Sequence, residues 1–381
     1  MKRVGNLYRF VYDLGNLRLA IWNASEHKRD RREVQEVLFN MDYFAYKLQD
    51  MLINKTYKAE PPKVVSKWMP NAKKWREISI PRFFPDLCVQ WAVMQILEPV
   101  FTKGAYYYSC GNMPGKGTMF AKKKVEKWVQ TDIRNTKYCL TMDIEKFYPS
   151  VNLGVLKNML RRKIKDRDIL WLLDEIIDVQ DRGLPIGYYS STWLSNFLLQ
   201  DLDHKIKEEF GGAAHYVRNV DDMVCFGANK RKLHKLRIMI DNYLRSIGLH
   251  LKGNWQVFRY GCKAKMRHKD ECRIVRVCDF VGYMFYRDHT KLRKKNSLKI
   301  TRAAKKISKK ARATVHQALS FISRLGWLRH CNSYNFYQKY IKDIVDMDSI
   351  KEVIRNASRK RQKEVSELYN ALKIGCSYLA G

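Results

Sequence analysis

Apolar residues recur along this chain at two kinds of spacing, and the spacing predicts which segments are helical and which are extended. Helix-like spacing predicts helices over 5–53, with a polar loop near 26–32, and over 86–101, 153–178 (two helices), 192–209 and 230–247. Short apolar runs predict strands at 63–66, 76–80, 140–144 and 280–286. A hairpin is predicted from 214–217 to 223–226, with its turn at Asn219–Asp222.

The charge balance indicates what such a fold binds. The chain has 381 residues, and 73 Lys and Arg against 38 Asp and Glu give a net charge of +35. This excess excludes an ordinary enzyme of small metabolites and favours nucleic acid or an anionic membrane surface as the partner. A hydrophobic content of 46% argues against a disordered chain.

Two further features narrow the location that we expect. No segment approaches the ~20 apolar residues of a membrane span, and the start of the chain does not resemble a secretory signal. The nine cysteines contain no Cys-x-x-Cys pair, which favours buried free thiols over zinc ligands or disulfides. We therefore expect a cytoplasmic protein, bacterial or phage-encoded, that makes no use of a membrane.

The C-terminal part of the chain carries much of the uncompensated charge. No acidic residue occurs from His289 to Lys342, and eleven Lys and Arg residues lie between Lys291 and Arg312. A face without counter-charges cannot neutralise itself, so we expect a helical surface that contacts phosphates. Trp327 and Tyr334 are predicted to pack in the core of this region.

Three carboxylates lie at positions where an ordinary core would not place them. Asp143 follows a buried apolar run, and Asp221 and Asp222 occupy the turn of an apolar hairpin. A turn alone explains an Asp pair, because Asp is favoured in turns. If the strands lie side by side, however, the three carboxylates converge and need divalent cations to offset their repulsion. With the basic charge, this pattern favours nucleotidyl transfer on nucleic acid with two metal ions.

An ordered series of motifs resembles the reverse transcriptases over roughly residues 55–345. The series comprises KWREISIP, SCGNMPGKGTMFA, DIEKFYPSV, GLPIGYYSSTWLSNFLLQDLDH, YVRNVDDMVCFG and FVGYMF. Within that family, NWQVF, FVGYMFYRDHTKLRKKN and FISRLGWLRHCNSYNF most resemble the prokaryotic enzymes of diversity-generating retroelements and of antiphage defence.

The resemblance implies an α+β fold, the right-hand polymerase fold of fingers, palm and thumb. We expect fingers with an N-terminal helical extension at 1–138, a palm at 139–287 with a small antiparallel sheet, and a helical basic thumb at 288–381. Asp143 and Asp221 would hold two Mg²⁺ ions, with Mn²⁺ as an alternative, and Asp222 would support the site.

The resemblance also implies roles around the nucleotide. Lys74 and Arg76 would grip the triphosphate, and the ring of Tyr148 would exclude a 2′-hydroxyl and favour dNTPs. Gly187 would let the backbone approach the base pair, because glycine has no Cβ. Ile186 precedes it, at a position where an apolar side chain resembles the error-prone retroelement enzymes.

Further residues are expected along the primer and template. Asn219 stands where the family usually has Tyr near the primer end, which predicts altered primer handling. Gly282 and Tyr283 lie in the segment that resembles the primer grip. Lys294 and Lys295 open the basic stretch of the thumb and would contact template and primer.

These observations predict an RNA-directed DNA polymerase that copies a dedicated noncoding RNA in antiphage defence. One alternative is the mutagenic enzyme of a diversity-generating retroelement, and a second is a polymerase-like RNA-binding scaffold without catalysis. The expected partners are template RNA, a DNA or RNA primer, the cDNA product and dNTPs. An accessory protein, a second polymerase subunit and a homo-oligomer remain open.

Overall fold

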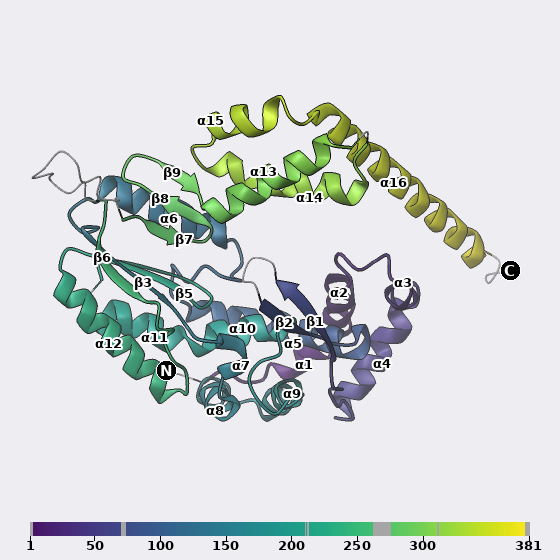
Figure 1. Cartoon of the computed structure of the whole chain (residues 1–381). Coiled ribbons are helices and arrows are strands. Elements are labelled where there is room, and N and C mark those ends of the chain that lie inside the picture. The colour runs from purple at the N-terminus through teal and green to yellow at the C-terminus, as the bar shows by residue number, and fades with distance from the viewer. Residues whose placement is uncertain are drawn as a thin grey trace, which may run out of the picture. The chain divides into compact units, whose positions relative to one another are not determined.

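The chain divides into two compact units, residues 1–276 and 277–381 (Figure 1). The structure, a computed structural model, describes residues 3–69, 74–209, 211, 213–261, 276–310 and 312–377, and the side chains of all of these except 74, 209, 361 and 364–377. The boundaries expected between fingers, palm and thumb stay a prediction. The segment 278–285, which we expected in the palm, groups with the second unit.

Four helices begin the first unit, as the pattern over 5–53 predicts. They are α1 (Tyr8–Val11), α2 (Leu14–Ala24), α3 (Arg32–Phe39) and α4 (Met41–Ile53). The carboxylate of Asp13 accepts a hydrogen bond from the backbone N–H of Asn16 at 3.1 Å, and this N-cap explains why α2 begins directly after Asp13. The apolar side of α2 packs against α5 (Cys88–Lys103) and α4.

A two-stranded hairpin follows the N-terminal helices. Its strands are β1 (Lys63–Met69) and β2 (Lys74–Ile80), which pair in antiparallel fashion and extend the strands predicted at 63–66 and 76–80. A π-helical turn, η1 (Phe83–Leu87), leads into α5, and α6 (Thr118–Thr131) completes this part. The side chains of β1 are almost all exposed, so the hairpin lies on the surface of its unit.

A four-stranded antiparallel sheet forms the centre of the first unit. Its strands are β3 (Tyr138–Asp143), β4 (His215–Asn219), β5 (Asp222–Gly227) and β6 (Gln256–Arg259), in the order β4-β5-β3-β6. The helix α12 (Lys230–Ser246) packs against β3, β5 and β6 (Figure 1). The predicted buried strand and the predicted hairpin are therefore confirmed, and they are neighbours in one small sheet.

Six short helices connect β3 to β4. They are α7 (Phe147–Ser150), α8 (Leu153–Lys163), α9 (Arg167–Ile177), α10 (Tyr189–Leu198), α11 (Gln200–His204) and the π-helical η2 (Lys205–Glu209). Side chains of Asn152 and Asp166 cap α8 and α9 by accepting backbone N–H groups. These caps explain why the apolar pattern over 153–178 gives two helices rather than one.

The second unit begins with a three-stranded sheet and continues as helices. The strands are β7 (Cys278–Phe280), β8 (Tyr283–Phe285) and β9 (Thr290–Leu292). We predicted one strand over 280–286, which is wrong, because Val281 (φ 43°) and Gly282 (φ 88°) form a turn within it. The helical segments are α13 (Lys294–Ser308), α14 (Val315–Leu325), η3 (Gly326–His330), α15 (Tyr334–Tyr337), η4 (Gln338–Lys342) and α16 (Met347–Ser377).

The exposure of two aromatic residues and the burial of the cysteines can be compared with the sequence predictions. Tyr334 is 75% exposed, so its predicted core role is wrong. Trp327 is itself 37% exposed, and it contacts the core by stacking on the buried Tyr283, at 5.5 Å between ring centroids. Five of the six cysteines with described side chains are buried, and all six are free thiols, as predicted. Cys262, Cys272 and Cys376 lie outside the part whose side chains are described.

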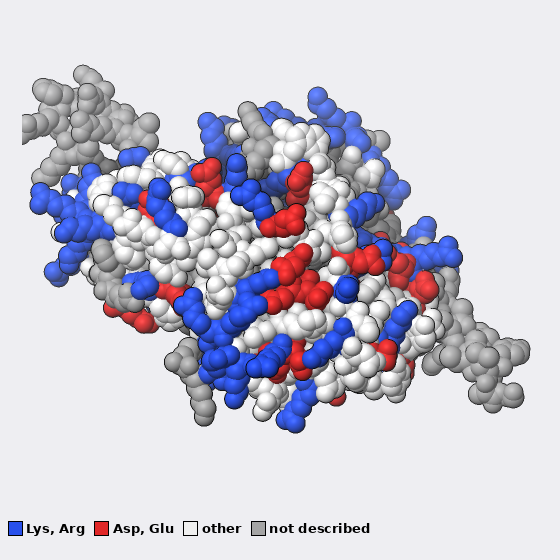
Figure 2. Space-filling model, turned by 90° about the horizontal axis from the view of Figure 1, so that it is seen from below, with Lys and Arg blue, Asp and Glu red and all other residues white. Residues whose placement is uncertain are grey.

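Basic side chains are more widespread than acidic ones on the visible face of the molecule. On the face in Figure 2, Lys and Arg occupy more area than Asp and Glu. Along the described stretches of the chain, no helix has the length and the apolar character that crossing a membrane requires.

Candidate active site

Two strands of the central sheet bring the predicted carboxylates together. β3 pairs with β5 so that Asp143, the last residue of β3, stands opposite Asp222. Asp221 lies in the turn between β4 and β5, and its carbonyl accepts the backbone N–H of Ile144 at 3.3 Å. The sheet therefore brings these two sequence-distant segments together at one edge, as the sequence predicts.

The electrostatics of this edge are set by the proximity of two carboxyl groups. Burial, the charge of Asp143 and a hydrogen bond between the two carboxyl groups together raise the pKa of Asp221 to about 6, and burial has the largest effect. The charge of Arg76 acts in the opposite direction and lowers the pKa of Asp221. The pair thus keeps a negative charge that a nearby cation would relieve.

The donor set of this edge fits a hard divalent cation. Carboxylate oxygens are the ligands that Mg²⁺ prefers, and Mg²⁺ commonly takes only one or two of them together with substrate phosphates. Among the side chains that the structure describes, no group of three or more His, Cys, Asp or Glu residues is arranged to hold a metal. The fit consequently rests on Asp143 and Asp221, with Asp222 adjacent to them.

Lys252 is a residue of this edge that the sequence did not reveal. Its Nζ lies 3.3 Å from Oδ2 of Asp143, and its backbone N–H donates to the Asp143 carbonyl at 2.8 Å. The contact follows from an isolated bridge between Ile144 and Leu251, which places the next residue beside the carboxylate. A single Lys after Leu251 carries no pattern of its own, so only the strand pairing could have identified it.

The predicted sugar gate lies beside the carboxylates. Tyr148, in α7, is half-buried, and its phenol oxygen accepts a hydrogen bond from the Ser195 hydroxyl at 3.4 Å. Burial raises the pKa of Tyr148, and the charge of Asp221 adds to this effect, which shows that the phenol and the carboxylate interact. Its role as a gate stays a prediction.

The residues predicted to grip the triphosphate lie on β2. Arg76 is exposed, and its charge reaches Asp221, so the hairpin presents a cation toward the carboxylates. Lys74 is the first residue of β2, and its side chain lies outside the part that the structure describes.

Ile186 and Gly187 join the same hairpin to the loop before α10. The carbonyl of Ile186 accepts the backbone N–H of Ser79 at 2.7 Å. Gly187 has φ 116°, and a Cβ at this position would lie 2.6 Å from the Ser79 carbonyl oxygen. Within the protein, glycine is therefore required by an approach to β2, a reason that the sequence did not suggest.

The structure places Asn219 beside the carboxylates, and it places the predicted primer-grip residues against Trp327. Asn219 ends β4 and pairs with Asp222, so it borders the carboxylates as expected. Tyr283 is fully buried, and its hydroxyl donates to the Trp327 carbonyl at 3.2 Å. A Cβ on Gly282 would lie 2.5 Å from the Trp327 ring. Both residues pack against Trp327, so the Tyr283 ring itself offers no surface to a primer, and the role of this segment as a primer grip stays a prediction.

The basic residues predicted to contact template and primer are accessible. Lys294 and Lys295 form the first turn of α13, and both side chains are exposed. The buried side of this helix consists of Ile300, Ala304 and Ile307, which leaves the lysines free of any packing role. The helical and basic character predicted for this region is confirmed.

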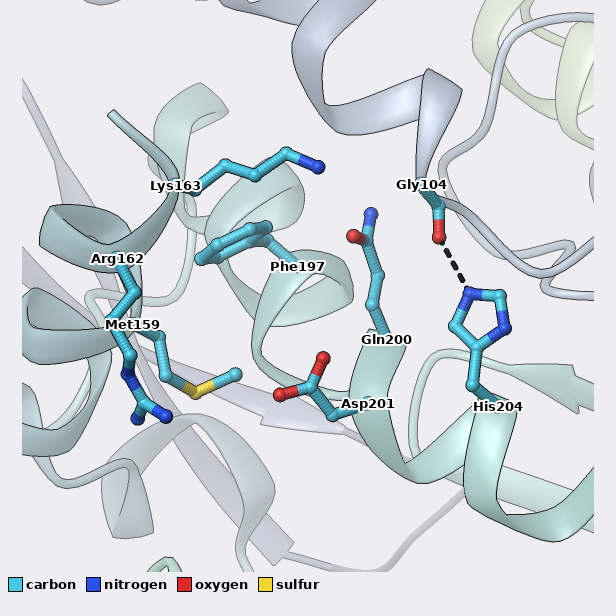
Figure 3. Close-up of a pocket in the computed structure, with 8 residues that line it drawn as sticks. All are labelled: Gly104, Met159, Arg162, Lys163, Phe197, Gln200, Asp201 and His204. Carbon is cyan, nitrogen blue, oxygen red and sulfur yellow. Dashed lines mark hydrogen bonds between the residues drawn. The ribbon is translucent and has the colours of Figure 1, made fainter. Parts of the chain in front are cut away.

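A separate pocket of about 220 Å³ contains none of the predicted site residues (Figure 3). It is lined by Gly104, Met159, Arg162, Lys163, Phe197, Gln200, Asp201 and His204. The His204 ring contacts the Gly104 carbonyl through Nε2 at 2.9 Å and the Glu208 carboxylate through Nδ1 at 2.7 Å. Both partners are acceptors, so the two contacts together require a protonated imidazole.

Comparison with known proteins identifies the family. The reverse transcriptase (RNA-dependent DNA polymerase) family matches residues 61–280, which include β1 through β7 and all three carboxylates. The chain belongs to the reverse transcriptase family. The right-hand polymerase fold expected from the motifs agrees with this membership and with the small antiparallel sheet.

The similarity of the chain to individual proteins is lower. The chain is 25% identical to the retron Ec73 reverse transcriptase of Escherichia coli over 215 residues, which is 52% of this chain and 64% of the relative. A solved apo telomerase from Candida tropicalis matches with a TM-score of 0.48 and 15% identity, covering 84% of this chain and 63% of that one. A telomerase from Candida albicans in complex with a telomeric RNA fragment matches with a TM-score of 0.46 and 12% identity, covering 75% and 55%. Similarity at this level supports no argument about function.

Proposed function

We propose that this protein is an RNA-directed DNA polymerase whose catalytic centre is the carboxylate edge of the central sheet. The observation that carries the proposal is the approach of Asp221 to Asp143 in a chain of the reverse transcriptase family. Adjacent carboxylates in a protein with a net charge of +35 are a specific place for metal ions, and the surrounding cations suit nucleic acid and triphosphate.

Asp143 and Asp221 would hold two Mg²⁺ ions, with Mn²⁺ as an alternative, and Asp222 would orient the turn that carries Asp221. When bound, these ions would activate the primer 3′-hydroxyl and offset the charge of the leaving pyrophosphate. Arg76 and Lys74 would bind the triphosphate of the incoming dNTP, since preorganised cations stabilise the charge that develops there. The ring of Tyr148 would select the deoxyribose.

Lys294 and Lys295 would contribute to binding the template–primer duplex. Contacts with phosphates supply affinity without sequence preference, which suits a polymerase. The large charge excess also supports a structured noncoding RNA as the dedicated template and antiphage defence as the role. The mutagenic copying of a retroelement repeat is the second candidate, because Ile186 precedes Gly187 as in error-prone relatives. The cytoplasmic location stays a prediction.

The test is synthesis by the protein purified with its own RNA. We expect Mg²⁺-dependent incorporation of dNTPs, and sequencing of the copurified RNA and DNA would separate the two roles. A fixed structured RNA with its cDNA supports defence, whereas a repeat matched to a variable gene supports the retroelement role. The same preparation would reveal an accessory protein, a second polymerase subunit or a homo-oligomer.

Two variants make this test specific for the carboxylates. Asp221→Ala together with Asp222→Ala should abolish synthesis while RNA stays bound. The matched control replaces Glu33 and Glu36, two exposed acids of α3, by Ala and should keep full activity. Synthesis that survives in the first variant would refute the site, and a wild-type protein that binds RNA but incorporates no dNTP would support the scaffold alternative.

A further inference from the structure

The side chain of Arg218 lies fully buried directly behind the turn that carries Asp221. Its Nε and Nη2 donate to the two carboxylate oxygens of Asp203 at 2.8 and 2.6 Å. Nη1 donates to Oδ1 of Asn196 at 3.1 Å and to the Val220 carbonyl at 3.0 Å, and Nη2 also donates to the Ser109 hydroxyl at 2.9 Å. All five N–H groups of the guanidinium are therefore used.

This buried ion pair contributes little net stability to the core. Both Arg218 and Asp203 have no exposed side-chain area, and removing two charges from water costs about as much as their attraction returns. Apolar residues of similar volume would serve stability equally well. What apolar residues could not supply is the bond to the Val220 carbonyl, the peptide group that directly precedes Asp221.

The turn itself needs support. Val220 has φ 61°, in the left-handed region that a β-branched residue rarely adopts. Such a conformation persists only when the surrounding structure holds it in place. A turn that relaxed toward an ordinary backbone conformation would move the next residue, Asp221, away from Asp143.

A second contact holds the turn from another direction. A Cβ at Gly111 would lie 2.5 Å from Cγ2 of Val220 and 2.6 Å from its backbone nitrogen, so the chain at Gly111 lies directly against the turn. The Gly111 carbonyl accepts Nδ2 of Asn196 at 2.6 Å, and the same Asn196 accepts Nη1 of Arg218. One amide thus connects the two supports.

We infer that Arg218 is a positioning residue that sets the metal affinity of the carboxylate edge by holding the Val220 peptide. The inference rests on the proposed role of Asp221 as a metal ligand. Arg218 touches neither substrate nor metal, and it acts only through the turn. Loss of its bond to Val220 should weaken metal binding and lower kcat, while KM for dNTP and affinity for template–primer change little.

The experiment removes the bond without leaving a buried charge unpaired. In the triple variant Asp203→Leu, Tyr216→Phe and Arg218→Met, the apolar side chains replace the ion pair, and Phe replaces the phenol that donates to Asp203 at 2.7 Å. We expect Mn²⁺ binding, measured by electron paramagnetic resonance of the free ion, to weaken roughly 10–100-fold, as loss of an outer-shell partner does. We expect kcat to fall roughly 100-fold, the effect of a ~1 Å displacement. Thermal unfolding should show a folded protein.

Gly111→Ala is an independent variant that leaves the ion pair intact. Its methyl group would push Val220, and we expect the same direction of change in Mn²⁺ affinity and in the Mg²⁺ concentration for half-maximal activity. Wild-type Mn²⁺ affinity and kcat in a folded triple variant would overturn the inference. If the triple variant does not fold, wild-type values in Gly111→Ala would overturn it instead.

A control separates this inference from the proposed function. Asp221→Asn should eliminate synthesis and most Mn²⁺ binding whatever Arg218 does. If Asp221→Asn retains both, the proposed site fails. If Asp221→Asn is inactive and the Arg218 and Gly111 variants behave like wild type, only the inference about Arg218 fails.

Discussion

Asp143 stands directly opposite Asp222 in the antiparallel pairing of β3 with β5. This register places Asp221, the preceding residue, in the turn beside the end of β3. A shift of the pairing by one residue would reverse the faces of every side chain in the strand, so the apolar pattern that fixes the register also fixes the carboxylates. Core packing and candidate chemistry therefore depend on the same strand alignment.

Asp221→Asn should stabilise the metal-free protein while it abolishes synthesis. Burial and Asp143 raise the pKa of Asp221 to about 6, so at pH 7 the folded state bears an unfavourable carboxylate charge. Because the folded pKa lies above the unfolded one, wild-type stability from this group rises as pH falls through about 6. We expect Tm of the variant to exceed that of wild type at pH 7 by roughly 2–4 °C, as about 1 kcal/mol gives.

Low pH should remove this difference between the Asp221 variant and wild type, and saturating Mg²⁺, which binds only the wild type, should cancel or reverse it. Near pH 4.5 the wild-type carboxyl is protonated, and saturating Mg²⁺ neutralises it at pH 7. Calorimetry with and without Mg²⁺ at both pH values measures the effect. A variant less stable than wild type at pH 7 without metal would show that Asp221 carries no such strain.

Tyr148→Ala should weaken the discrimination between dNTPs and NTPs. The charge of Asp221 acts on the half-buried phenol, and we propose that the ring meets the sugar of a nucleotide bound to the carboxylates. We expect the ratio of kcat/KM for dNTP over NTP to fall roughly 10–100-fold, the range of a small steric contact. Tyr148→Phe is the control, because it keeps the ring and removes only the 3.4 Å bond with Ser195. Unchanged discrimination in Tyr148→Ala would exclude the gate.

The strands and carboxylates were predictable because their signals are local. Asp143 ends an apolar run, and the hairpin with Asp221 and Asp222 has short, continuously buried strands on both sides, so pairing was the simplest way to bury all three. Lys252 was not predictable, because its position depends on a single bridge between Ile144 and Leu251. The burial of the Tyr283 ring was not predictable, because a family motif does not state which side of a strand is buried.

The contacts of Arg218 behind the turn were likewise not predictable from the sequence. Arg218 directly follows the predicted strand at 214–217, and the sequence contains no sign that Asp203, Asn196 and Ser109 meet it. Those partners come from three separate segments, and only the packed structure shows that they converge. Local periodicity thus predicts elements and their chemistry, whereas the contacts that position this chemistry are long-range.

Lys252→Met should lower the Mg²⁺ concentration needed for half-maximal activity. The ammonium lies 3.3 Å from Asp143, and both side chains are substantially exposed, so the pair contributes little to stability. It does place a positive charge where a cation would bind, and its removal should strengthen Mg²⁺ binding by roughly 2–5-fold. Lys235→Met, an exposed lysine of α12, is the control with the same change in charge. A higher Mg²⁺ requirement would instead indicate that Lys252 assists the bound state.

Lys294→Ala together with Lys295→Ala should reduce the salt dependence of template–primer binding. Each phosphate contact releases counterions, so the slope of log K against log salt should become shallower by about 1.4–1.8 for two lost contacts. The control replaces Lys230 and Lys232, exposed residues of α12, by Ala. Filter binding from 50 to 300 mM salt measures the slopes, and equal slopes in both variants would remove the specific role of α13.

His204 should stabilise the first unit below neutral pH and lose this effect as pH rises. The Gly104 carbonyl raises the pKa of His204 above 6.5, and the Glu208 carboxylate raises it further. Because the folded pKa exceeds the unfolded one, the contribution is complete below pH 6.5 and disappears as pH passes the folded pKa. Thermal unfolding of wild type and His204→Gln from pH 5.5 to 8.5 should give a difference in Tm that is largest in acid and shrinks in base. Glu208→Gln, which keeps the bond to Gly104, should reduce this dependence only partly. A difference that is independent of pH would mean that the ring holds Gly104 as a neutral donor, without Glu208.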